Sequence, residues 1–288
     1  MLFRSSDVVN YTRDGAFEFN AEGNLVNPTG QRVQGYKLNE NGETVGDLTD
    51  VQVNTNSSIG AQQTQNIDLS TNLNADAKES TFELKNPNSS SNFTTSSTIY
   101  DSLGEPHTLT TYFTKANNTT NYWNYHVTVS SDEVDTSGLE TADTDDDGED
   151  DIVRVGTGNF SFKENGELDF TDLTAYTGDT VDSDGDGTPD KINTVELPWN
   201  NGADATQKVE YAFDLTQYSG QSEVVRQDQD GNASGNLVDV NVDQEGTVIA
   251  NYSNGETTEE FRLGLAQFAN TDGLKRAGNN LFESTPES

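Results

Sequence analysis

Two short stretches of the sequence hold most of the side chains that could do chemistry. Each places carboxylates at relative positions 1, 3, 5 and 9, with a glycine at position 6. Hard oxygen ligands at alternating positions around a sharp glycine turn are typical of calcium loops. The sequence therefore predicts calcium as the candidate cofactor, and no other. The predicted metal ligands are Asp143, Asp145, Asp147 and Asp151 in the first stretch, and Asp182, Asp184, Asp186 and Asp190 in the second.

Neither stretch is a complete EF-hand loop. Position 12, which holds a bidentate glutamate in an EF-hand, is Arg154 in the first stretch and Asn193 in the second. No helical pattern flanks either stretch, so the match is closer to the short aspartate-rich calcium loops of extracellular β proteins. The alternative, a solvated acidic loop without an ion, stays open.

An enzymatic function is not expected. The chain has only two histidines, His107 and His126, and both lie in strand-like runs where a structural role is expected. It contains no P-loop, G-x-S-x-G or H-E-x-x-H motif. With no cysteine it has no thiol nucleophile, no disulfide and no Cys-ligated zinc.

The charge of the chain excludes two classes of partner. The formal net charge is -35, from 50 acidic and 15 basic residues. Nucleic acids and anionic membrane surfaces would be repelled, so neither is a predicted partner. No apolar run approaches the ~20 residues of a transmembrane helix, and the first residues lack a signal-peptide core.

Short alternating runs between turn signals predict an all-β fold. Examples are the runs "AFEFN", "TLTTYF", "YHVTV" and "VIANY", which are bounded by turns such as "AEG", "SLG", "QEG" and "SNG". Residues 54–98 are rich in Asn, Ser, Thr and Gln, which indicates a connecting segment with little core of its own. The tight patterning of the start returns near residue 226. We therefore predict two β-rich domains, an inner one from 1–68 and 226–288 and an outer one, 69–225, inserted into it.

Four segments carry a family resemblance. The segment "YTRDGAFEFNAEGNLVNPTGQRVQGY", Tyr11 to Tyr36, resembles one that flagellar rod and hook proteins share. The segments that begin "YDSLGEPH" at Tyr100 and "QDGNASGN" at Gln229 resemble hook proteins in particular. The segment "LAQFANTDGLKRAGNNLFEST", from Leu265, resembles the return into the shared domain. Within the first segment, Gly15, Gly23 and Gly30 are expected at turns that need a positive φ or a close approach of the backbone.

The resemblance implies a structural subunit of the bacterial flagellar hook, the flexible joint that couples rod to filament. It implies partners of two kinds, copies of the chain itself in the hook and other rod and hook proteins at its junctions. It places the protein outside the cell, exported without a cleaved signal peptide. The alternative from another class is a calcium-dependent extracellular adhesin or binding module.

The resemblance also indicates what this stretch of chain lacks. Hook proteins have long amphipathic helices at both ends, and neither end here shows a heptad pattern. The chain is therefore predicted to be a fragment that holds the outer two domains and is monomeric on its own.

Overall fold

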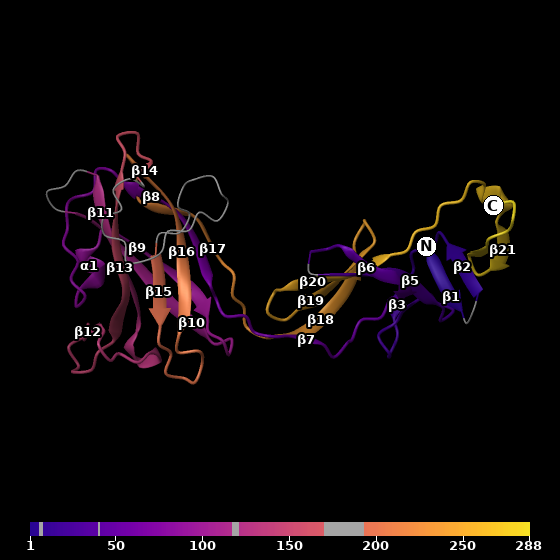
Figure 1. Cartoon of the computed structure of the whole chain (residues 1–288), viewed down its shortest axis with the longest axis horizontal. Helices are drawn as coiled ribbons and strands as arrows, with labels where there is room; N and C mark the ends of the chain where they lie inside the picture. Colours follow the sequence, from indigo (N-terminus) through magenta and orange to yellow (C-terminus); the bar gives the residue numbers. More distant parts are fainter. Residues whose placement is uncertain (6–7, 40, 117–120, 170–192) are drawn as a thin grey trace. The chain divides into compact units, whose positions relative to one another are not determined.

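The computed structural model describes residues 1–5, 8–39, 41–116, 121–169 and 193–288 (Figure 1). Regular structure in these residues is almost entirely strand, with one short helix and brief 3-10 turns, so the all-β prediction is confirmed. No helix in the described part of the chain has the length and apolar character needed to cross a membrane.

The chain divides into two compact units. Unit 1 combines Met1–Gly60 with Ser234–Ser288, and unit 2 is Ala61–Ala233. The boundaries predicted from the sequence, after 68 and after 225, need correction because they fall inside strands β8 (Asn66–Asn74) and β17 (Glu223–Gln229). Cutting there would divide two strands that pair with each other.

Unit 1 is built on one twelve-stranded sheet, as far as the described residues show. Its central strand β5 pairs with β1 from the N-terminal part and with β20 from the C-terminal part. The two ends of the chain therefore build one sheet. The strands are β1 (Leu2–Ser5), β2 (Val8–Thr12), β3 (Glu18–Phe19), β4 (Leu25–Val26), β5 (Arg32–Leu38), β6 (Thr44–Asp50), β7 (Ser58–Ile59), β18 (Gly235–Val242), β19 (Thr247–Tyr252), β20 (Thr257–Leu263), β21 (Lys275–Gly278) and β22 (Leu281–Glu283), with a 3-10 turn η3 (Thr271–Gly273).

The core of unit 1 draws on both ends of the chain. Phe3, Val33 and Val51 from the first part pack with Val248 and Leu263 from the last part. Neither half buries its apolar face without the other. Because apolar burial is worth about 25 cal/mol per Å² removed from water, each half stabilises the other.

The glycines of the first family-like segment have different roles. Gly23 has φ +77°, and a Cβ at this position would lie 2.0 Å from the carbonyl oxygen of Val53, so no other residue fits. Gly30 also has φ +77° but open space around it. Gly15 shows neither a left-handed φ nor a close neighbour, so the expectation that it meets a backbone requirement is wrong.

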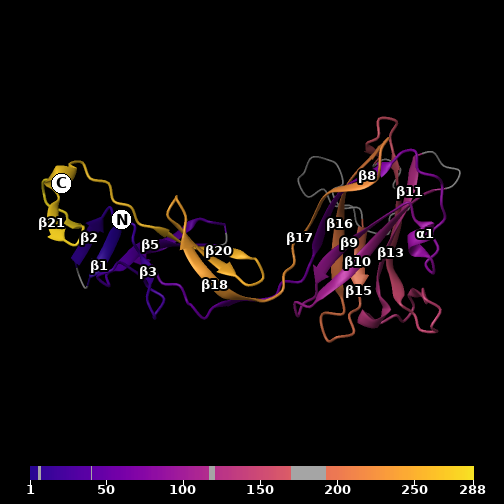
Figure 2. The same ribbon diagram turned by 180° about the vertical axis from the view of Figure 1, so that it is seen from behind.

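Unit 2 consists of two sheets packed face to face, seen as two layers in Figures 1 and 2. One sheet has the order β12-β13-β11-β10-β9, with β14 beside β13, and the other has the order β15-β16-β8-β17. Besides β8 and β17, the elements are β9 (Phe93–Tyr100), β10 (Pro106–Lys115), β11 (Tyr122–Ser130), β12 (Glu140–Ala142), β13 (Ile152–Phe162), β14 (Leu168–Asp169), β15 (Asn193–Leu197), β16 (Gln207–Tyr218), the helix α1 (Pro87–Ser90) and the 3-10 turn η1 (Ser131–Glu133).

Strand β8 corrects the prediction that residues 54–98 form a connecting segment. Its side chains alternate between partly exposed and buried along all nine residues, with Ile67, Leu69 and Leu73 in the core. A strand with one buried face needs an apolar side chain only at every second position. The intervening Asn, Asp and Ser residues lowered the average hydropathy and hid the strand.

Aromatic side chains join the two sheets of unit 2. Phe213 on β16 lies 5.1 Å from Tyr125 on β11 and 6.3 Å from Phe113 on β10, measured between ring centroids. Such edge-to-face pairs add about 0.5–1.5 kcal/mol each to the gain from burial. Gly158 on β13 leaves room for the Tyr125 ring, because a Cβ there would lie 2.4 Å from the tyrosine oxygen.

Candidate functional site: an acidic loop and a buried histidine network

The first acidic stretch is the connection between two antiparallel strands, β12 and β13. Its own carboxylates shape it. Asp143 accepts hydrogen bonds from the backbone N–H of Asp146, at 2.6 Å, and of Gly148, at 2.9 Å. Asp146 and Gly148 have φ +65° and +100°, conformations that aspartate and glycine tolerate better than most residues. The alternating aspartates therefore stabilise the turn by accepting hydrogen bonds from its backbone.

Three of the four predicted ligands of this loop come together. The carboxylate oxygens of Asp143, Asp145 and Asp151 lie within 4.8 Å of one another. Asp147 is not in this group, and its carboxylate accepts a hydrogen bond from the backbone N–H of Glu149. The second predicted loop, with Asp182, Asp184, Asp186 and Asp190, lies outside the described residues.

The acidic loop already has partners within the protein. Asp151 accepts hydrogen bonds of 2.6 Å from the side chain and the backbone N–H of Thr144, and these bonds lower the pKa of Asp151. Lys85 forms an ion pair with Asp146. Calcium takes six to eight oxygen ligands, whereas three carboxylates supply only part of that number. The donor set suits calcium chemically but is incomplete, so the calcium site stays a prediction.

We expect calcium at millimolar concentration to raise the melting temperature of the chain. Binding to the native state alone adds about 2.7 kcal/mol at a hundredfold excess over Kd. The double substitution Asp143→Ala and Asp145→Ala should remove the part of the rise that comes from this loop. Differential scanning calorimetry with calcium, magnesium and sodium at equal ionic strength measures it. A calcium shift no larger than the sodium shift would identify a solvated loop without an ion.

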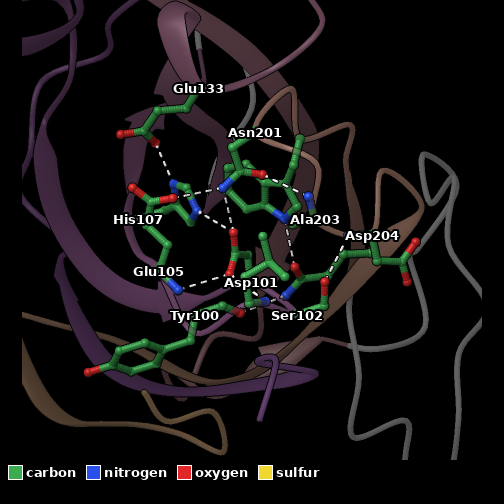
Figure 3. A network of polar contacts seen from close by, with 12 residues as sticks. Tyr100, Asp101, Ser102, Glu105, His107, Glu133, Asn201, Ala203 and Asp204 are labelled. Atoms are coloured by element: carbon green, nitrogen blue, oxygen red, sulfur yellow. Dashed lines mark hydrogen bonds and ion pairs between the residues drawn. The ribbon is translucent and has the colours of Figure 1, made fainter. Parts of the chain in front are cut away.

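A second cluster of titratable and polar side chains lies in unit 2, beside the turn that joins β9 to β10 (Figure 3). His107 on β10 is 5% exposed and Asp101, in the β9–β10 turn, is fully buried. The ring nitrogens of His107 lie 3.3 Å from a carboxylate oxygen of Asp101 and 3.0 Å from one of Glu133. Its ring stacks on Trp199 with centroids 3.8 Å apart.

Asp101 organises this cluster. One carboxylate oxygen accepts hydrogen bonds from the backbone N–H of Leu103 and of Glu105, which closes the turn. The other faces His107 and accepts a 2.6 Å hydrogen bond from the side-chain amide of Asn201. Burial alone would raise the pKa of Asp101, but the hydrogen bonds donated to it, the largest contribution coming from Asn201, hold that pKa below its ordinary value.

The cluster also links the two sheets. Trp199, which follows β15, donates a 2.6 Å hydrogen bond to the side chain of Gln207 on β16. Gln207 in turn donates to the carbonyl oxygens of Thr64 and Tyr100. No local pattern in the sequence predicts this network, because its members are spread from residue 64 to residue 207. The only local signals were the buried-type Trp in "LPWN" and the histidine close after "DSLGE".

A metal ion does not suit this cluster, although Asp101, Glu105 and His107 lie close enough to share one. Both ring nitrogens of His107 already face carboxylates, and each Asp101 oxygen has two polar neighbours. Asn201 also donates to Glu105 at 2.9 Å. Each of these groups has polar neighbours within the fold, which is the arrangement of a structural network.

The other histidine is packed on the outer side of the same sheet. The His126 ring stacks on Phe82 at 4.0 Å, and its Nδ1 lies 2.9 Å from the hydroxyl of Thr157. Burial, with the nearby charge of Arg154, lowers the pKa of His126 to about 4, so the ring is neutral near pH 7. Both histidines therefore make contacts within the fold.

We expect Asp101→Asn to destabilise unit 2 by about 1–3 kcal/mol near pH 7, because buried donors lose their acceptor. A carboxylate whose pKa is lowered on folding stabilises the fold above its unfolded pKa of about 3.9. That contribution is lost as the pH falls through the folded pKa, so the wild-type advantage should shrink towards pH 3. Urea unfolding across pH 3–8 measures it, with the exposed Asp135→Asn as control. An equal effect of both substitutions would contradict this account.

Two family models match the chain in consecutive stretches. Residues 3–72 match the D1 domain of the flagellar hook protein FlgE/F/G family, and residues 72–232 match the D2 domain of the flagellar basal body protein FlaE family. The second match alone covers more than half of the chain.

Curated relatives align along the whole chain. A flagellar hook protein FlgE of Treponema pallidum is 30% identical and one of Salmonella typhimurium is 27% identical, each over 100% of this chain. An Escherichia coli relative of the same name is 29% identical. The chain spans 64% of the length of the first two and 63% of the third.

The fold agrees with a solved structure. The Helicobacter pylori flagellar hook protein FlgE2 superposes with a TM-score of 0.59, covering 98% of this chain and 88% of that one, at 14% identity. At that identity the likeness shows the fold alone. Together with the two family models and the whole-chain alignments, it leads to one conclusion: this chain belongs to the bacterial flagellar hook protein family.

Proposed function

We propose that this chain forms the greater part of a structural subunit of a bacterial flagellar hook. The observation that carries the proposal is that hook proteins align with this chain over its whole length. The fold supports the same role. Two β units with separate cores and polar surfaces suit a protein whose work is packing against neighbours.

The finer parts of the proposal concern assembly and place. Copies of the chain would pack along a helical lattice through repeated heterologous contacts, which do not close on themselves. Rod and hook proteins would meet it at the two junctions. The subunit would be extracellular, exported without a cleaved signal peptide, and would act as a flexible joint between rod and filament. Hydrated polar surfaces favour this flexibility, because many weak contacts slide more easily than one dry interface.

The relatives are longer than this chain, and we propose that their additional segments supply contacts along the hook axis. The stretch described here would then be monomeric by itself. The adhesin alternative has no specific support, since the alignments along the whole chain are to hook proteins. In the described residues both histidines contact partners within the fold, which gives no support to an enzyme either.

Deleting the gene in its own bacterium should abolish hooks and motility, and the full-length gene on a plasmid should restore both. The control is the gene with a frameshift before residue 60. Immunogold electron microscopy with antibody raised against unit 2 should decorate a short curved segment at the base of each filament. Normal hooks in the deletion strain, or antibody bound elsewhere on the cell, would overturn the proposed function.

A further inference from the structure

The acidic residues of unit 2 are unevenly distributed. Of the 33 acidic residues between Ala61 and Ala233, only Asp101 and Glu105 lie in the 46 residues from Asn86 to Ser131. Asp101 is buried in the histidine network, and Glu105 accepts a hydrogen bond from Asn201 beside it. The rest of that span is rich in Ser, Thr, Asn and aromatic residues.

In the folded unit this span forms the neighbouring strands β9, β10 and β11. Thr98 pairs with Thr108, and Ser96 pairs with Thr110, their hydroxyls 3.1 Å apart. These four side chains alternate with buried residues such as Ile99 and Leu109, so they point away from the core. We call the four residues Ser96, Thr98, Thr108 and Thr110 the hydroxyl face.

The outer face of the other sheet is different. On β8, β15 and β16 its outward positions alternate in the same way with buried residues, and carboxylates lie at outward positions on all four of its strands. They are Asp68 on β8, Glu196 on β15, Glu210 and Asp214 on β16, and Glu223 and Asp228 on β17. The outer face of this sheet therefore carries charged side chains, whereas the four residues of the hydroxyl face on the other sheet carry none.

An exposed leucine lies at the end of the hydroxyl face. Leu103, in the turn that joins β9 to β10, is 61% exposed. Its backbone N–H donates a hydrogen bond to the buried carboxylate of Asp101. The same carboxylate accepts hydrogen bonds from the backbone N–H of Glu105 and from the side chain of Asn201. Leu103 therefore lies in a turn whose backbone is fixed by hydrogen bonds to a buried side chain. A side chain on a fixed backbone loses less conformational entropy on binding than one on a mobile loop.

These observations together indicate a contact surface. Charged residues are depleted in the cores of protein interfaces. Copies of a chain with a net charge of -35 repel one another, and the approach that brings fewest carboxylates together is the least costly. We propose that the hydroxyl face and Leu103 contact a second copy of this chain. The proposal rests on the proposed function, which supplies the assembly in which copies meet.

The test uses the full-length gene in its own bacterium. Leu103→Glu and the double substitution Thr98→Glu and Thr108→Glu place carboxylates on the proposed contact. Val225→Glu is the matched control, because Val225 is 69% exposed on β17 of the other sheet and receives the same charge. We expect the first two variants to reduce hooks per cell about tenfold or more, as for a contact centre, and the control to stay within twofold of wild type.

Labelling of single introduced cysteines tests the proposal even if a glutamate variant misfolds. The chain has no cysteine, so Thr108→Cys gives a single thiol in this stretch, with Glu149→Cys in the exposed acidic loop as control. In assembled hooks, maleimide should label Cys at 108 about tenfold more slowly than in the free chain, while labelling at 149 is unchanged. Equal labelling at 108 in both states would overturn the proposal, as would folded glutamate variants that build normal hooks. Hooks that persist without the gene would instead overturn the proposed function.

Discussion

The pairing of the two segments that enter and leave unit 2 is the constraint on which the rest of the structure depends. β17 runs antiparallel to β8 from Glu223 opposite Asn72 to Gln229 opposite Ile67. The pairing continues as a bridge between Gln62 and Asn232, and β7 then pairs with β18 inside unit 1. Because both crossings are made by neighbouring strands, the middle of the chain folds as an insertion while the two ends complete one sheet.

Side chains of the "QDG" stretch fix this entry and exit. Asp230 accepts hydrogen bonds from the backbone N–H of Gln65 and Asn66, at 2.8 and 2.9 Å. Gln229 accepts one from the hydroxyl of Thr64, and a Cβ on Gly231 would lie 2.2 Å from that hydroxyl. This stretch, read from the sequence as a family resemblance, therefore has a physical task. It holds two strands together whose residues are about 165 positions apart in the chain.

What the sequence could predict was local. Alternation in β11, β16 and β19 and the turn glycines were enough for an all-β fold. β8 was missed because its outward positions are Asn, Asp and Ser, and its parallel pairing with β16 joins residues about 144 positions apart, which no local pattern encodes. A separation of 100 positions, between Asp101 and Asn201, likewise hid the Asp101–His107–Trp199 network. In the first acidic loop, residue spacing identified the carboxylates, but only the turn geometry separated Asp147 from the other three.

The most direct test of this account is whether unit 2, cut at its structural boundaries, folds alone. Both tryptophans of the chain, Trp123 and Trp199, are buried in unit 2, so their fluorescence reports on that unit. Residues 61–233 expressed alone should unfold in urea in one cooperative transition, with the same midpoint as the tryptophan signal of the whole chain. Residues 69–225, which cut β8 and β17, should have a lower midpoint or no transition. Equal midpoints for the two pieces, or an unfolded 61–233 piece, would contradict the account.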